Sequence, residues 1–444
     1  MIKNHHNFPI IIIGSGPTGL ALAMGLKKIG INATVFEQRS KVEVINGNEE
    51  RSVNITLSSR GILALKQIGC SDKVIQGSAG VVGRTYFIDG KSHFVPYTLL
   101  PNQRLHSIRR KNLEHILIQE AEKKGIKINF GYKLLEVNTN TSTCKFLYKG
   151  KEVKRNYLFL FGADGINSRV RDSLCMPHSM LMLDYVYKRV EIDAKNAVNI
   201  GLNNSTVNIW PNPEGMLLSL PNKDGSHSGL LHIKSNIVDD ICINPKLLND
   251  YFPVLVKDIV DFSIKFHKAS AGAFGTINCT MWSLRKNILL LGDAAHAMVP
   301  FYGQGTNCGF EDAKIICDLI KNNSDNIERA ICVFQDIRPK DTDAVANLSV
   351  RNLKNLEMKQ SFEDYITFKN LDLALEQKFS NYRSEYFLVA FSDQPFSKIL
   401  DISDKCHPIL LEYAKRKAFK GKKSFPEETL NEVYSKLKDI YEIK

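Results

Sequence analysis

The chain has 444 residues, of which 43% are hydrophobic and 24% are charged, a balance typical of a globular protein with two or three domains. No uncharged apolar run reaches the roughly 18 residues of a membrane helix, and the first residues show no signal-peptide pattern. The net charge of +12 is spread along the chain without a nucleic-acid-binding motif. We therefore expect no membrane span and no nucleic acid, and we interpret the charge as a basic surface that also suits an anionic substrate or a cofactor phosphate.

The nine cysteines are odd in number, scattered, and never spaced as Cys-x-x-Cys. This spacing argues against both a disulfide framework and a zinc site. We therefore expect reduced thiols in a cytoplasmic protein that binds no metal.

Apolar spacing predicts alternating strands and helices through the first part of the chain. These are strands at 9–13 and 33–36, helices at 20–29, 58–68 and 107–123, and strands at 126–130 and 157–161. From 180 to 281 short β-like segments alternate with turns, as in an inserted antiparallel sheet. A buried strand at 288–291 and a helix at 308–320 follow, and the chain beyond about 325 is mainly helical. The predicted fold is α/β and Rossmann-like, with an inserted antiparallel sheet and a C-terminal helical region.

A glycine turn joins the first strand to the first helix. Gly14, Gly16 and Gly19 form the pattern Gly-x-Gly-x-x-Gly. In this pattern the first glycine allows a tight turn, the second lets a pyrophosphate approach the backbone, and the third lets helix and strand pack closely. Glu37 ends the second strand, where a carboxylate accepts hydrogen bonds from an adenosine ribose. We predict dinucleotide binding, and the alternative is a glycine-rich turn in an unrelated α/β protein.

A β-hairpin is predicted at 84–97, with Asp89-Gly90 as its turn. A two-residue turn places residue 84 opposite residue 95, so that Arg84 and Tyr97 become diagonal neighbours on one face. From spacing alone, a binding pair and a solvated strand face are equally good interpretations.

A second acidic turn follows the strand at 157–161. It contains Asp164 and Gly165, and Arg169 and Arg171 follow on a predicted helix. An Asp-Gly pair at a strand end beside cations suits a site where two phosphorylated cofactors meet, although Asp-Gly also marks many ordinary turns.

The stretch 287–313 carries the strongest signal. Asp293 follows the strand at 288–291, at the carboxyl end where ligands bind in open α/β sheets. Pro300 then leads into a glycine-rich turn made of Gly303, Gln304, Gly305, Thr306 and Asn307. The helix that follows directs its free N–H groups and partial positive charge towards Asp293, which suits a ligand such as a reduced flavin. The alternative is an ordinary strand–loop–helix.

Together, the motifs at 14–37, 162–171 and 292–307 resemble those of the single-component, FAD-dependent aromatic hydroxylases, which have the fold of 4-hydroxybenzoate hydroxylase. The resemblance covers about residues 1–325. Within this group, the chain is most similar to the kynurenine 3-monooxygenases, through stretches at 51–69, 209–222, 292–312 and 386–392. The implied domains are an FAD-binding domain at 1–75, 100–178 and 282–325, a substrate domain at 76–99 and 179–281, and a helical region at 326–444.

The resemblance also implies a reaction. NADPH is the cosubstrate that reduces FAD, the reduced flavin reacts with O2, and the resulting C4a-hydroperoxide transfers one oxygen atom to L-kynurenine, giving 3-hydroxykynurenine. Because the flavin carries the oxygen chemistry, no catalytic acid, base or nucleophile is expected. The alternative is an FAD hydroxylase of the same mechanism that acts on another small aromatic substrate. We expect a monomer or homodimer without the C-terminal membrane anchor of the animal enzymes.

Residue roles follow from the same resemblance. Substrate-binding residues are expected at Arg84, Tyr97, Tyr302 and Tyr386, and at either Asn352 or Asn355. The expected cofactor-binding residues are Gly14, Gly16, Gly19, Glu37, Arg110, Asp164, Asp293, Pro300, Gly303, Gly305, Thr306 and Asn307. We expect His296 to be a structural histidine packed by the strand end.

Overall fold

The computed structural model describes residues 9–46, 54–88, 90–324, 326–356 and 362–441, except for the side chains of 46, 355 and 356. The chain divides into two compact units. The first unit contains Met1–Ser78, Ile108–Met182 and Gly275–Ala346. The second unit contains Ala79–Ser107, Leu183–Phe274 and Asn347–Lys444. Residues 347–444 thus group with the inserted sheet. The expected roles of the FAD-binding domain, the substrate domain and the helical region remain predictions.

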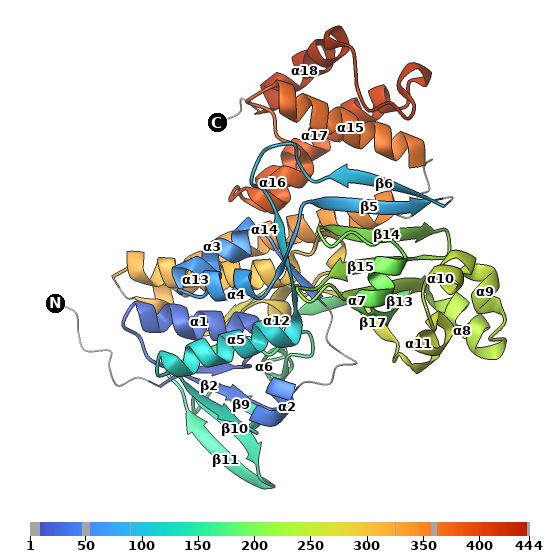
Figure 1. Ribbon diagram of the computed structural model, residues 1–444. Helices are drawn as coiled ribbons and strands as arrows, with labels where there is room; N and C mark the ends of the chain where they lie inside the picture. Colours follow the sequence, from blue (N-terminus) through green and yellow to red (C-terminus); the bar gives the residue numbers. More distant parts are fainter. Residues whose placement is uncertain (1–8, 47–53, 89, 325, 357–361, 442–444) are drawn as a thin grey trace. The chain divides into compact units, whose positions relative to one another are not determined.

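A six-stranded sheet forms the centre of the first unit (Figure 1). In order across the sheet, the strands are β18 (Ser283–Leu284), β19 (Ile288–Leu290), β12 (Phe159–Gly162), β1 (Ile10–Ile13), β2 (Ala33–Glu37) and β8 (Lys127–Phe130). All neighbours pair in parallel except β18, which is antiparallel to β19. Because β1 lies between β12 and β2, the strand order reverses at β1, and ligands bind in the crevice at such a point.

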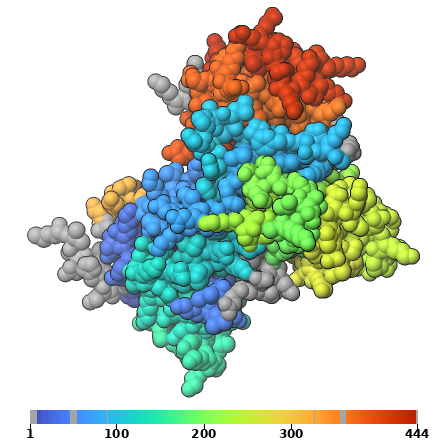
Figure 2. Space-filling model, in the orientation of Figure 1, coloured from blue at the N-terminus to red at the C-terminus, as the bar shows by residue number. Residues whose placement is uncertain are grey.

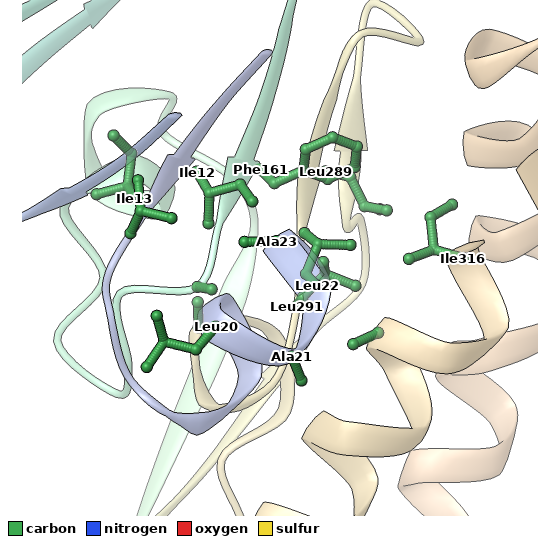
Figure 3. Packing of buried hydrophobic residues seen from close by; sticks show 14 of the residues in the cluster. Ile12, Ile13, Leu20, Ala21, Leu22, Ala23, Phe161, Leu289, Leu291 and Ile316 are labelled. Carbon is green, nitrogen blue, oxygen red and sulfur yellow. The ribbon is translucent and has the colours of Figure 1, made fainter. Parts of the chain in front are cut away.

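The core of this unit lies between the sheet and helices α1 (Pro17–Lys28) and α13 (Gly305–Asn322). The register places Ile12, Phe161 and Leu289 side by side on three neighbouring strands. Figure 3 shows them together with Leu22 of α1 and Ile316 of α13, and all five side chains are buried. Four consecutive isoleucines in β1 are buried, as expected for a strand covered on both faces.

Further elements complete the first unit. They are α2 (Lys41–Asn46), β3 (Asn54–Leu57), α3 (Ser59–Gln67), α4 (Ser71–Gln76), α5 (Arg110–Lys123), β9 (Lys133–Asn138), β10 (Thr143–Tyr148), β11 (Lys151–Asn156), α6 (Arg169–Ser173), α12 (Asp293–His296), the 3-10 turn η2 (Pro300–Tyr302) and most of α14 (Ile327–Leu356). Strands β9 to β11 form a separate antiparallel sheet.

A seven-stranded sheet dominates the second unit. Its strands, in spatial order, are β17 (Gly272–Cys279), β13 (His178–Ile192), β16 (His227–Lys234), β15 (Gly215–Pro221), β14 (Thr206–Asn212), β5 (Gly83–Ile88) and β6 (Lys91–Pro96). The short strands β4 (Ala79–Val81) and β7 (Leu105–Arg109) pair with each other. The helices that follow the sheet strands are α7 (Ala194–Asn199), α8 (Ser235–Ile243), α9 (Leu247–Tyr251), α10 (Pro253–Asp258) and α11 (Phe262–Lys268). Their apolar side chains share one core cluster with Trp210 and Leu231 of the sheet.

The C-terminal helices lie on the hairpin of β5 and β6. They are α15 (Phe362–Lys378), α16 (Glu385–Phe391), α17 (Phe396–Ala414), the 3-10 turn η3 (Lys417–Phe419) and α18 (Glu427–Tyr441). In Figures 1 and 2 these helices, coloured orange to red, cover the light-blue hairpin. None of the helices in the described residues combines the length and apolar character that crossing a bilayer requires.

The α/β fold class and the inserted sheet are confirmed, and one detail differs from expectation. The helix predicted at 107–123 begins only at Arg110, because Leu105–Arg109 is extended and pairs as β7. The predicted hairpin register is confirmed, since Arg84 pairs with Val95. Asp89, the first residue of its expected turn, lies outside the described residues.

Candidate functional site

The three glycines of the first motif meet different surroundings. Gly14 has a φ of +101°, and a side chain there would come within 2.4 Å of the Ala163 carbonyl oxygen. A side chain at Gly19 would come within 2.1 Å of the Gly14 carbonyl oxygen. Gly16 has nothing within 4 Å of the position that its Cβ would occupy. Packing therefore requires glycine at 14 and 19. Gly16 instead leaves open space beside the N-terminus of α1, where anionic groups bind.

A cavity of about 240 Å³ opens at the carboxyl ends of β1, β2 and β12. Five of the expected cofactor residues line it, namely Gly14, Gly16, Glu37, Arg110 and Asp164. Arg169, which the sequence analysis placed beside Asp164, also lines it, whereas the polar residues Gln38, Arg39, Tyr132 and Asn167 of the same wall were not predicted. Residues of the motifs at 14–37 and 162–171 therefore line one cavity.

Hydrogen bonds from Ser15 and Arg39 fix the position of the Glu37 carboxylate in this cavity. Its Oε2 accepts hydrogen bonds from the backbone N–H and the hydroxyl of Ser15, at 2.9 and 2.8 Å. Its Oε1 accepts from the backbone N–H and Nε of Arg39, both at 2.9 Å. Burial acts to raise the pKa of Glu37, but the hydrogen bonds and charge of Arg39 outweigh it, and the pKa lies below its usual value. The carboxylate therefore stays ionised.

Asp164 and Arg110 contribute charge to the same cavity. Burial raises the pKa of Asp164, against hydrogen bonds that its carboxylate accepts from the Ser168 hydroxyl at 2.6 Å and the Val170 N–H at 3.1 Å. Nε of Arg110 donates a 3.0 Å hydrogen bond to Glu114. Arg39 reaches the other oxygen of Glu114 at 3.5 Å, so both guanidinium groups stand at the same carboxylate.

The remaining cofactor residues gather at the start of α13. This helix begins at Gly305, three residues before its predicted start, and Thr306 and Asn307 lie in its first turn. A Cβ at Gly305 would meet only Met298 and Oδ1 of Asp293, at 3.8 and 3.9 Å. The helix N-terminus thus faces the exposed Asp293 carboxylate, as the sequence predicted, and a Cβ at Gly305 would make only ordinary van der Waals contacts. Pro300 is exposed at the start of η2.

Asn307 has a different environment from Gly305. Its amide nitrogen donates to the carbonyl oxygens of Thr56 and Gly303, at 2.9 and 2.8 Å. Its amide oxygen accepts from the backbone N–H of Ser58 at 2.9 Å. The Asn307 side chain therefore braces the glycine turn against β3 and α3, so any contact that it makes with a ligand comes from its backbone.

Thr18 connects the first and last motifs, and the sequence reasoning missed it. Side chains at Gly292 and Gly309 would come within 2.7 and 2.2 Å of its hydroxyl oxygen. The two glycines therefore allow the turn after β19 and the helix α13 to close around the first turn of α1. The sequence shows glycines at 292 and 309, but it does not show that both of them face Thr18.

Asp312 fixes the turn that carries Asp293. Its carboxylate is fully buried and accepts hydrogen bonds from the Gly292 N–H at 2.9 Å, from Nε2 of His296 at 2.6 Å and from Nε of Arg338 at 2.7 Å. Burial opposes ionisation, but the charges of His296 and Arg338 lower the pKa of Asp312 to about 2. His296 is buried and stacks on Trp282, with ring centroids 4.9 Å apart, which is the environment expected of a structural histidine.

A second site lies within the second unit, around Arg84. This side chain is 7% exposed, and its guanidinium carbon lies 5.8 Å from the ring centroid of Tyr97 and 5.2 Å from that of Tyr386. The two tyrosine rings are stacked at 4.3 Å. No ion pair among the described residues involves Arg84. The hairpin geometry that made Arg84 and Tyr97 neighbours is therefore confirmed, and Tyr386 joins them.

Four further residues complete this cluster, which the sequence reasoning missed. Tyr86, Tyr365, Lys369 and Asp372 line, with Arg84, Tyr97 and Tyr386, a recess of about 20 Å³. The hydroxyls of Tyr86 and Tyr365 are 2.9 Å apart, and the Arg84 guanidinium is 3.5 Å from the Tyr365 hydroxyl. The available signal was the spacing of Tyr365, Lys369 and Asp372, which places them on one face of a helix.

Asn352 and Tyr302, the other expected substrate residues with described side chains, are not among the residues that line this recess. Asn352 is buried on α14. The side chain of Asn355, on the same helix, lies outside the described part of the chain. Tyr302 is buried in η2 of the first unit. All nine cysteines are free, and the described residues contain no cluster of three potential metal ligands.

Comparison with known proteins shows which family the chain belongs to. Residues 7–322 match the family described as FAD binding domain. The chain is 31% identical to kynurenine 3-monooxygenase of Flavobacterium johnsoniae, over 91% of this chain and 94% of that protein. It is 31% identical to the enzyme of the same name from Candida albicans, over 90% of this chain and 92% of that protein.

Solved structures share the fold at lower identity. 2-Methyl-3-hydroxypyridine-5-carboxylic acid oxygenase superposes with a TM-score of 0.67 at 20% identity, over 80% of this chain and 93% of that one. p-Nitrophenol 4-monooxygenase from Pseudomonas putida gives a TM-score of 0.66 at 16% identity, over 80% of this chain and 90% of that one.

Proposed function

Because the chain belongs to the family of FAD-dependent monooxygenases that contains the kynurenine 3-monooxygenases, we propose that it hydroxylates L-kynurenine to 3-hydroxykynurenine with NADPH and O2. The oxygen reaches the ring by the flavin route that the sequence resemblance implies. The enzyme class and the FAD cofactor follow from the family, whereas the substrate and NADPH are the content of the proposal.

The choice of L-kynurenine as the proposed substrate rests on the environment of Arg84. A buried guanidinium is costly unless an anion pairs with it, and the described residues offer no carboxylate within ion-pair distance. The guanidinium fork binds both oxygens of a carboxylate, which lysine does not. The stacked rings of Tyr97 and Tyr386 line the recess beside the Arg84 guanidinium, where an aromatic ligand can pack against them. An aromatic compound with a carboxylate, such as L-kynurenine, matches both features.

The residues of the first unit fit FAD. Gly16 leaves open space at the N-terminus of α1, where the pyrophosphate would bind. Glu37 is the ionised acceptor for the ribose hydroxyls. Gly305 and Asp293 lie at the N-terminus of α13, whose partial positive charge favours an anionic ring. Bound FAD supplies the activation of O2, and the protein supplies positioning and exclusion of water.

One assay tests this proposal. Purified, FAD-loaded protein is given NADPH with and without L-kynurenine, NADPH oxidation is followed by absorbance, and the product is identified by mass. We expect L-kynurenine to accelerate NADPH oxidation and to yield a product heavier by one oxygen atom. If L-kynurenine has no effect while another small aromatic acid is hydroxylated, the same chemistry serves that substrate instead.

A further inference from the structure

One face of α15 carries an unusual run of polar residues. Tyr365, Lys369, Asp372 and Glu376 are spaced by four, three and four residues, so they lie in a row on one side of the helix. Asp372 and Glu376 are each 2% exposed. Acidic side chains are rarely buried unless they are paired or have a function. The two acids differ in their hydrogen-bond partners.

Glu376 is accounted for by its protein partners. It accepts a 2.6 Å hydrogen bond from the Thr98 hydroxyl, at the end of the β5–β6 hairpin. Its other oxygen accepts from the backbone N–H and the hydroxyl of Ser384, both at 3.3 Å, and Ser384 caps the start of α16. Glu376 thus ties the hairpin and α16 to α15, which is a structural role.

Asp372 has fewer partners and a different position. The Tyr382 hydroxyl donates a 2.6 Å hydrogen bond to its Oδ1. In the described part of the chain, Asp372 belongs to no ion pair within 4.0 Å, and Arg84 belongs to none either. Both side chains line the same recess. Lys369 also lines it but is partly exposed, so water stabilises its charge. Two buried, oppositely charged side chains thus line one small recess.

A zwitterion satisfies both groups at once. The recess of about 20 Å³ has room for one or two groups of the size of water, such as the charged end of a ligand. An α-amino acid presents a carboxylate and an ammonium on one carbon atom. We propose that Asp372 binds the α-ammonium of the substrate while Arg84 binds its carboxylate, so that the second unit selects aromatic amino acids over aromatic acids without the amino group. This inference rests on the proposed function and names a specificity residue for it.

The test compares ligands that differ in one group. L-Kynurenine is compared with its des-amino analogue, 4-(2-aminophenyl)-4-oxobutanoate, in calorimetric titrations of the FAD-loaded, oxidised protein without NADPH. We expect the wild type to bind L-kynurenine at least about tenfold more tightly, because the analogue leaves a buried carboxylate unpaired. This measurement needs no variant, and equal affinities for the two ligands overturn the inference.

Variants then assign the preference to a residue. Asp372→Asn keeps the shape of the side chain and its acceptor for Tyr382, and we expect it to bind the two ligands within about threefold of each other. Asp401→Asn makes the same change in an exposed surface pair with Lys405 on α17 and should behave as wild type. Arg84→Ala should weaken both ligands, because both carry the carboxylate.

Two kinds of failure are distinguishable. If the wild type hydroxylates L-kynurenine and Asp372→Asn keeps the tenfold preference, the ammonium subsite is overturned while the proposed function stands. If L-kynurenine neither binds nor stimulates NADPH oxidation in the wild type, the proposed function and the inference both fail.

Discussion

Nε of Arg338 donates a 2.7 Å hydrogen bond to Oδ1 of Asp312, and both side chains are almost wholly buried. The other carboxylate oxygen of Asp312 accepts from the backbone N–H of Gly292, the residue before Asp293. A residue on α14 thereby fixes the end of β19 through a carboxylate on α13. Arg338 lies beyond residue 322, where the match to the FAD-binding family ends.

Asp312→Asn should lower the free energy of unfolding by about 1.5–3 kcal/mol, because it weakens a buried, charge-assisted hydrogen bond while Arg338 keeps its ion pairs with Glu311 and Asp341. Urea denaturation measures this loss. Asp401→Asn, in its exposed pair, should cost about 1 kcal/mol or less. Since the pKa of Asp312 is lowered to about 2, its contribution is complete above its usual value near 3.8 and is lost as the pH falls towards 2. Equal losses in the two variants would contradict the prediction.

Gly305→Val should give a folded protein that does not retain FAD. A Cβ at this position meets protein atoms only at 3.8 Å or more, so the protein itself tolerates it, whereas a ligand in that space does not. The measurements are the flavin absorbance after purification and the thermal midpoint Tm. A yellow variant with normal turnover would show that the flavin lies elsewhere.

Gly303→Val is the matched control for that substitution. Gly303 has a φ of +66°, and its Cβ would come within 2.2 Å of the Thr56 hydroxyl. This variant should lose stability even without FAD, so the pair separates loss of the cofactor from loss of the fold.

Arg84→Ala should raise the apparent KM for L-kynurenine by about tenfold or more and leave the FAD content unchanged. The reason is the loss of a buried, charge-assisted contact worth about 1.5–3 kcal/mol. Arg84→Lys should recover only part of the loss, since lysine lacks the planar fork. Steady-state kinetics with matched flavin content give the answer, and wild-type kinetics in Arg84→Ala would place the carboxylate site elsewhere.

Asp372→Asn should stabilise the ligand-free protein at pH 8 but not near pH 4. Burial raises the pKa of Asp372 from 3.8 to about 6. Its ionisation therefore costs stability, by up to about 3 kcal/mol, and this cost appears as the pH rises from 4 through 6. Urea denaturation at both pH values, with Asp401→Asn as control, measures the difference. A variant that is less stable at pH 8 would contradict this prediction.

The fold and the cofactor motifs were predictable because they rest on local patterns. Four isoleucines before Gly14 and the acid at Glu37 specify a strand, a turn and a second strand within 28 residues. The register of β5 and β6 followed from the length of one turn. These features depend on neighbours in the sequence, which a single chain displays.

The missed residues depend on contacts across long separations. Thr18 stands beside Gly292 and Gly309, and no periodicity links those positions. Asp372 and Arg84 come from segments 288 residues apart that share one recess. The spacing of residues on α15 predicts a polar face. Only the packing of that face against β5 shows that Asp372 shares a recess with the positively charged Arg84.

The exposure of each free cysteine determines whether it reacts with a labelling reagent. Cys175 and Cys242 are exposed, Cys332 is half-buried and the other six cysteines are buried. Burial raises the pKa of those six thiols, which slows their reaction with maleimides. Cys175 belongs to the first unit and Cys242 to the second. A donor and an acceptor dye on these two native positions would therefore report, by energy transfer, any displacement between the units during turnover.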